Sequence, residues 1–172
     1  MPQTYEEARM EYRPTHIKTL FIGESRPAGG NFFFNENSNL YNATKEAFEK
    51  VSSVHFNCEI FSQYGCWLYD VCDVPVNNLL RSERRKLIRE GITTLRNTLQ
   101  TLDPEYVVVV KKGDFGKIVY PQVLELGFID GETSCLLPFP LYQYRKQYVC
   151  ELAAMLKKQS GYESIWTRNQ KY

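Results

Sequence analysis

The sequence lacks an excess of charge of either sign, because its 21 lysines and arginines are nearly balanced by 20 aspartates and glutamates. The formal net charge of +1 argues against a uniformly basic nucleic-acid coat and against an acidic tail protein, although it allows a local basic face. The chain also lacks the low hydrophobicity of a disordered segment, since 43% of its 172 residues are hydrophobic and can form a sizeable core.

Metal-binding patterns are missing as well. The two histidines, His16 and His55, stand apart in the sequence, and the five cysteines include no pair with C-x-x-C spacing. We therefore expect no metal site, no iron–sulfur cluster and no other cofactor. We also expect the cysteines to be reduced and buried rather than joined in disulfides.

The chain has no long hydrophobic run, since no stretch reaches the roughly 18 to 20 apolar residues that span a bilayer. Its first residues lack the basic-then-apolar order of a signal peptide, and neither repeats nor a linker divide it. These absences predict a single domain over residues 1–172, in a monomeric, cytoplasmic protein with no membrane association.

Four alternations of strand and helix are present. Apolar runs at residues 17–22, 66–72, 106–110 and 133–137 predict strands, and the third run, Tyr106-Val-Val-Val-Val110, indicates burial on both faces. Apolar residues at helical spacing follow each run, near residues 40–51, 82–102, 115–126 and 142–158. The predicted fold class is therefore α/β, a three-layer sandwich in which helices cover both faces of a four-stranded parallel sheet.

In such sheets, ligands bind outside the carboxyl ends of the strands. We therefore expect the loop Gly23–Phe34 and the segment Leu137–Arg145 to line one cleft. Within it, Glu24 and at least one of the three consecutive phenylalanines at positions 32–34 should face inward.

The loop Gly23-Glu-Ser-Arg-Pro-Ala-Gly-Gly-Asn-Phe-Phe-Phe34 is the most unusual segment of the chain. It matches neither G-x-x-x-x-G-K-[ST] nor G-x-G-x-x-G, the common nucleotide-binding patterns. Its glycines permit close approach of a ligand, Glu24 is placed to act as a base or to orient a water, and a phenylalanine ring can stack on a planar base. In the alternative interpretation, Glu24 is an ordinary loop carboxylate and the phenylalanines belong to the core.

A buried strand ending in Gly-Glu-Ser, followed by Pro-Ala and Gly-Asn-Phe-Phe, resembles the first motif of the uracil-DNA glycosylase superfamily. The chain is more closely similar to glycosylase-like proteins that share Gly-Glu-Ser, the Asp-Val-Pro-Val-Asn loop at residues 73–77 and Leu-Pro-Phe-Pro at residues 137–140. This resemblance implies a uracil-DNA glycosylase-like fold over most of the chain. It also implies a DNA-repair hydrolase that cleaves the N-glycosidic bond of a damaged base flipped out of DNA.

The resemblance further implies roles for particular residues. Glu24 corresponds to the catalytic acidic residue that positions the attacking water, and either Phe32 or Phe33 to the aromatic residue that stacks on the base. Asp70 and Asn77 are alternative candidates for the base-reading asparagine after the second strand. The implied base-binding set is Gly23, Ser25, Phe32, Phe33, Asp70 and Asn77.

One family motif is absent, the His-Pro-Ser whose histidine stabilises charge on the departing base; the corresponding loop reads Leu137-Pro-Phe-Pro140. A donor of this kind contributes roughly 3–4 kcal/mol, and Tyr142 or Arg145 could replace it. If nothing replaces it, the chain is a catalytically silent module of the same fold that binds nucleic acid or a nucleotide. A third possibility is an unrelated flavodoxin-like domain, although the Ser/Thr-rich phosphate loop expected there is not found.

Basic residues at two strand ends predict contacts with phosphate groups. Lys111 and Lys112 follow the third strand, and Arg145 and Lys146 open the last helix. A further basic cluster at residues 81–89 has the pattern of an ordinary solvated helix face. The predicted partner is DNA that is damaged or single-stranded.

Overall fold

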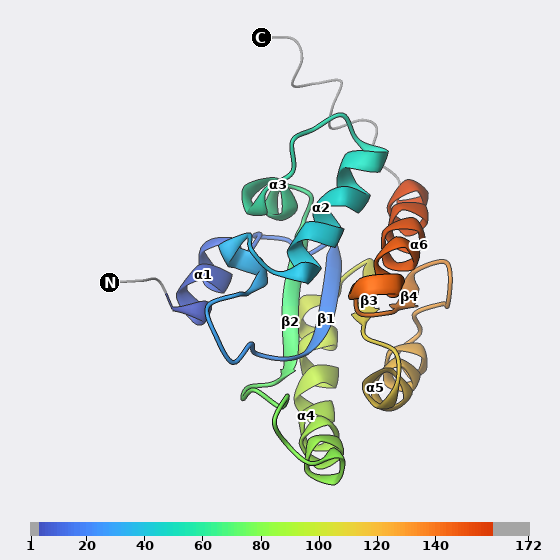
Figure 1. The fold of residues 1–172 in the computed structure, drawn as a ribbon. Helices are drawn as coiled ribbons and strands as arrows, with labels where there is room; N and C mark the ends of the chain where they lie inside the picture. Colours follow the sequence, from blue (N-terminus) through green and yellow to red (C-terminus); the bar gives the residue numbers. More distant parts are fainter. Residues whose placement is uncertain (1–3, 160–172) are drawn as a thin grey trace.

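The computed structural model describes residues 4–159. Four parallel strands form one sheet in the order β2-β1-β3-β4, as Figure 1 shows. The strands are β1 (Thr19–Ser25), β2 (Cys66–Cys72), β3 (Tyr106–Val110) and β4 (Ser134–Leu137). The α/β class and the parallel sheet are therefore confirmed, with β1 extending three residues beyond its predicted end, through Glu24 to Ser25.

Two pairs of long helices cover the sheet. Helix α2 (Asn39–Val51) packs against α6 (Arg145–Lys158), and α4 (Arg81–Leu102) packs against α5 (Asp114–Glu125), so that each pair lies on one side of the sheet (Figure 1). The α2–α6 pair shares a buried hydrogen bond of 2.8 Å between the hydroxyls of Thr44 and Tyr148. On the other side, α4 approaches β2 so closely that a Cβ at Gly91 would lie 2.6 Å from the carbonyl oxygen of Val71.

Two helix starts differ from those predicted. Helix α4 begins at Arg81, one residue before the predicted start at residue 82, and the free N–H of Leu80 donates to Oε2 of Glu83 at 3.1 Å. Helix α6 begins at Arg145, since Tyr142 has a positive φ of 44° and opens the short 3-10 helix η2 (Tyr142–Tyr144).

Three short elements complete the described fold: α1 (Tyr5–Glu11), α3 (Cys58–Gln63) and the 3-10 helix η1 (Phe33–Asn35). Helix α3 was not predicted, because six residues are too few to establish a helical period. Its first turn depends on a local cap, in which Asn57 Oδ1 accepts a hydrogen bond of 2.8 Å from the N–H of Ile60.

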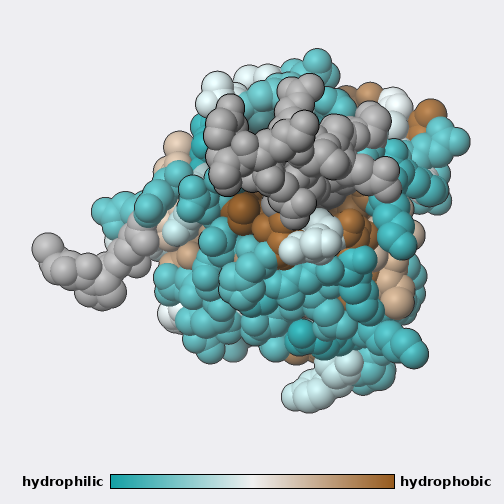
Figure 2. Space-filling model, turned by 90° about the horizontal axis from the view of Figure 1, so that it is seen from above, coloured by the Kyte–Doolittle hydropathy of each residue, from teal (hydrophilic) through white to brown (hydrophobic). Residues whose placement is uncertain are grey.

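The core lies on both faces of the sheet. Val107 to Val110 of β3 are at most 1% exposed, as their unbroken apolar run predicted. Many of the aromatic residues form one buried cluster that joins α2, α3 and η1, including Phe33, Phe48 and Phe61. The surface seen from above is mainly hydrophilic (Figure 2), and no helix within residues 4–159 is long and apolar enough to cross a membrane.

Candidate functional site

A cavity of about 530 Å³ opens at the carboxyl ends of β1, β2 and β3. Strand residues Gly23, Leu68 and Val110 line it, together with the loop after β1 and with Phe139 and Leu141 from the segment after β4. The prediction that these two segments share one cleft is confirmed. In the order β2-β1-β3-β4 the chain passes from β1 to β2 on one side and only later to β3 on the other side of β1. The cavity therefore lies at the topological switch point, where open α/β sheets bind ligands.

Glu24 lies in this cavity as the shared acceptor of two cations. Its Oε1 accepts a hydrogen bond of 2.6 Å from Arg84 Nε, and its Oε2 accepts from both Arg84 Nη2 and Lys111 Nζ. Arg84 comes from the second turn of α4 and Lys111 from the residue after β3, so three separate elements meet at one carboxylate. The Glu24 side chain is only 7% exposed, against 25% for Arg84 and 33% for Lys111.

Glu24, Arg84 and Lys111 form a trio of charged groups, and the two cations decide whether Glu24 is ionised. Burial acts to raise the pKa of Glu24, but the hydrogen bonds and positive charges of Arg84 and Lys111 outweigh burial and hold that pKa below its ordinary value. The carboxylate is therefore ionised at neutral pH. With two cations and one anion, the trio carries a net charge of +1.

Lys111 adopts a backbone conformation that lysine seldom takes. Its φ of 99° lies in the region favoured by glycine, where a residue with a Cβ is strained by roughly 1–3 kcal/mol. The conformation is held by the sheet, since the Lys111 N–H donates to the carbonyl oxygen of Leu137 at 2.9 Å. The strained residue is the one whose side chain reaches Glu24 in the cavity.

A second carboxylate, Asp70, lines the cavity next to the N-terminal helix. Tyr5 of α1 donates its hydroxyl to Asp70 Oδ2, and Gly23 leaves no room for a Cβ beside Asp70 Oδ1. Desolvation raises the pKa of Asp70 to about 6, although the hydrogen bond from Tyr5 acts in the opposite direction. Unlike Glu24, Asp70 therefore changes its charge close to neutral pH.

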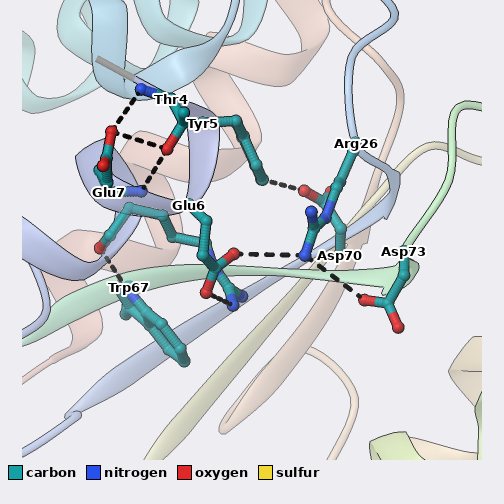
Figure 3. A network of polar contacts seen from close by, with 9 residues as sticks. Thr4, Tyr5, Glu6, Glu7, Arg26, Trp67, Asp70 and Asp73 are labelled. Carbon is teal, nitrogen blue, oxygen red and sulfur yellow. Dashed lines mark hydrogen bonds and ion pairs between the residues drawn. The ribbon is translucent and has the colours of Figure 1, made fainter.

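Arg26 ties α1 to this edge of the sheet (Figure 3). Its guanidinium lies 3.3 Å from Glu6, 3.9 Å from Asp73 and 5.8 Å from the centre of the Tyr5 ring. Phe32 packs edge-on against the same Tyr5 ring, with 5.3 Å between the ring centres. Tyr5 thus joins the wall of the cavity, which nothing in the local sequence indicated.

The three phenylalanines of the first loop are all buried, and two of them also line the cavity. Phe32 and Phe33 both line the cavity, while Phe33 also packs against Phe61 at 4.8 Å in the buried aromatic cluster. Asparagines hold the loop in place: Asn37 accepts a hydrogen bond from the N–H of Phe32 at 3.1 Å, and Asn35 donates to the carbonyl of Gly30 at 3.0 Å. The prediction that Glu24 and at least one ring face the cleft is confirmed.

The eleven predicted site residues fall into two groups. The structure brings eight of them to the cavity lining: Gly23, Glu24, Ser25, Phe32, Phe33, Asp70, Asn77 and Lys111. Three predicted phosphate ligands, Lys112, Arg145 and Lys146, are not among the described lining residues. Lys112 lies 3.7 Å from Glu151 and Arg145 lies 3.2 Å from Glu46, so two of them have carboxylate partners instead.

The loop that replaces the histidine motif supplies apolar wall rather than a donor. Phe139 and Leu141 line the cavity, whereas Tyr142 is 89% exposed and, like Arg145, is absent from the described lining. The two donors expected from the sequence are therefore absent from the described lining, which contains two other cations, Arg26 and Lys111.

Within residues 4–159, no group of three or more histidine, cysteine, aspartate or glutamate side chains could hold a metal ion. The described lining of the cavity contains an ionised carboxylate, a titratable carboxyl, a lysine, an arginine and aromatic walls. Comparison with known proteins adds no family: no family model matches the chain, and no curated protein is significantly similar to it.

Proposed function

We propose that the cavity receives a base turned out of a nucleic acid, and that the chain is a uracil-DNA glycosylase-like protein that hydrolyses the N-glycosidic bond of that base. The observation that carries this proposal is the Glu24–Lys111 contact inside an aromatic-walled cavity at the switch point of the sheet. The cavity volume of about 530 Å³ lies within the range of about 300–1,000 Å³ typical of small-ligand sites.

Cleavage of an N-glycosidic bond separates charge. The sugar develops positive, oxocarbenium-like character, while the departing base becomes negative. Glu24 is ionised and can stabilise the sugar and orient the attacking water, because Oε1 accepts a single hydrogen bond within the described structure. Lys111 Nζ can stabilise the departing base, so the cation takes the part of the missing motif histidine.

The walls of the cavity support capture of a planar ring. Phe32 and Phe139 provide apolar surface, and Asp70 and Asn77 provide polar groups that can read the edge of a base. Because desolvation strengthens the interactions of Glu24 and Lys111 with developing charge, an apolar wall also favours the reaction itself.

A second candidate function is capture of a base without chemistry. Both oxygens of Glu24 already accept hydrogen bonds from Arg84 or Lys111, so the carboxylate has limited freedom to engage a water. On this interpretation, the same cavity is the binding site of a nucleic-acid or nucleotide-binding module.

One experiment separates these functions. Oligonucleotides that contain uracil, hypoxanthine or a mismatched base are incubated with excess protein, and the released base is measured by chromatography. Glycosylase function predicts release by the wild type and a rate at least about tenfold lower for Glu24→Gln, while Lys112→Gln serves as a matched control outside the cavity. Binding without release of any base would support the silent module, and neither binding nor release would overturn both proposals.

A further inference from the structure

We propose that Lys111 is also a nucleophile toward the sugar, and that the chain cuts nucleic acid at abasic sites through an imine formed by Lys111 Nζ. This inference rests on the proposed function only in requiring that the sugar reaches the cavity. It adds a strand-cleaving lyase activity to base release.

The placement of Lys111 is the first argument. Among the described residues that line the cavity, Lys111 carries the one primary amine, which is the group that forms an imine with an aldehyde. Its amine touches Glu24, the group expected to face the sugar, and its side chain is only one-third exposed. The positive φ of 99° shows that the sheet holds this residue in an unfavourable backbone conformation, as is common at functional sites.

The charge of the trio is the second argument. A lysine paired alone with a buried carboxylate would leave an isolated negative charge if it lost a proton. Here Arg84 holds Glu24 through two hydrogen bonds of its own, so loss of a proton from Lys111 leaves a neutral Arg84–Glu24 pair. Because an arginine side chain does not deprotonate in proteins, Lys111 is the member of the trio that can become a neutral nucleophile.

The lyase reaction follows from the charge separation of base release. Heterolysis of the N-glycosidic bond leaves the electron pair on the base, which takes a proton from the Lys111 ammonium and departs neutral. Water adds to C1′ of the oxocarbenium ion and gives up a proton, and the resulting hemiacetal opens to the aldehyde. The free amine of Lys111 then adds to C1′ of this aldehyde, and with uptake of that proton water is lost to form the protonated imine. A base then removes a C2′ proton, the C3′–O bond breaks with departure of the 3′-phosphate, and water hydrolyses the imine to restore Lys111.

Lys112 is a control that the chain itself offers. It directly follows Lys111 and is 45% exposed, but it lies 3.7 Å from Glu151 and does not line the cavity. If the aldehyde of an abasic site reacted with any accessible amine, it should therefore modify Lys112 at least as much as Lys111.

The experiment starts from an oligonucleotide with a preformed abasic site, so that no base release is needed. The protein is incubated with it in the presence of sodium borohydride, which reduces an imine to a stable amine, and the covalent adduct is measured by denaturing gel electrophoresis. We expect a one-to-one adduct that maps to Lys111 by mass spectrometry, and strand cleavage when borohydride is left out.

Variants decide whether the cavity lysine is responsible. Lys111→Arg keeps a cation beside Glu24 but cannot form the imine, so adduct should fall at least about tenfold while thermal unfolding stays near that of the wild type. Lys112→Gln should react as the wild type does. Equal adduct yields for Lys111→Arg and the wild type, an adduct that maps to another amine, or no adduct at all would each overturn the proposal.

Failure of the lyase is distinguishable from failure of the glycosylase. Release of a base without an adduct on abasic DNA would leave the glycosylase proposal intact and overturn the lyase. An adduct at Lys111 without release of any base would support the lyase and count against the glycosylase.

Discussion

Glu24→Gln should destabilise the protein far more than Lys111→Met, although the two side chains touch each other. Removal of the carboxylate leaves Arg84 and Lys111 side by side without the anion that both of them contact. Removal of the lysine instead leaves the neutral Arg84–Glu24 pair with both of its hydrogen bonds. The asymmetry follows from the trio's net charge of +1.

The structure sets the expected size of this difference. Loss of one partner from a buried ion pair costs about 3–5 kcal/mol. Because Arg84 and Lys111 are 25% and 33% exposed, water reduces the penalty, and we expect about 2–3 kcal/mol for Glu24→Gln. We expect about 1 kcal/mol or less for Lys111→Met, the value of a partly exposed pair. For a domain of this size, the first loss corresponds to a fall in melting temperature of roughly 4–12 °C.

Urea unfolding followed by circular dichroism measures both losses, first near neutral pH and then in acid. The pKa of folded Glu24 lies below its ordinary value of 4.5, so its stabilisation is complete above that value and is lost as the pH falls through the lower, folded value. The difference between wild type and Glu24→Gln should therefore be constant near neutral pH and shrink in acid. Equal losses for the two variants, or a difference that acid leaves unchanged, would refute this account of the trio.

Four further variants test the cavity wall and the aromatic cluster behind it. The wild type should lose stability as the pH rises from about 4 to about 6, because the pKa of Asp70 is raised to about 6 and the folded state binds an extra proton across that window. Asp70→Asn should abolish this loss, which urea unfolding at several pH values measures. Phe33→Ala should lower the unfolding free energy by about 3–5 kcal/mol in thermal unfolding, since Phe33 is 3% exposed in the aromatic cluster. Phe32→Ala should mainly weaken capture of a 2-aminopurine base, by about 1–3 kcal/mol in a fluorescence titration, and equal effects of the two variants would contradict this division. Gly23→Ala should retain its circular dichroism spectrum but lose base capture, because the added Cβ collides with Asp70 Oδ1; normal capture would count against Asp70 as part of the site.

The local sequence was sufficient to predict the strands of the sheet and part of the candidate site. The valine run of β3 could be predicted as a buried strand because its pattern depends on neighbouring residues alone, and Glu24 could be found because it follows an apolar run. Parallel strands then place Glu24 and Lys111 at the same edge, which geometry alone requires. These predictions needed no knowledge of which side chains meet.

The partners of these side chains could not be predicted. Arg84 stands 60 positions from Glu24 on a helix whose charged face looks like ordinary solvated surface, and Tyr5 stands 65 positions from Asp70. Neither contact leaves a local pattern, since each depends on how α4 and α1 pack at the end of the sheet. The positive φ of Lys111 is equally invisible, because lysine has no preference for that conformation.

The pairing of Glu24 decides which chemistry suits the cavity. A general base works best with a pKa near the working pH, whereas Arg84 and Lys111 hold the pKa of Glu24 below its ordinary value. A carboxylate that stays ionised is instead suited to stabilise positive charge that develops beside it, and the fixed ammonium of Lys111 is suited to the matching negative charge, with no reorganisation of either. Opposite charges set side by side favour breaking a bond into ions, which is what N-glycosidic cleavage requires. In the proposed reaction, the departing base accepts the proton of Lys111, so the step that ends base release also prepares the amine to attack the sugar.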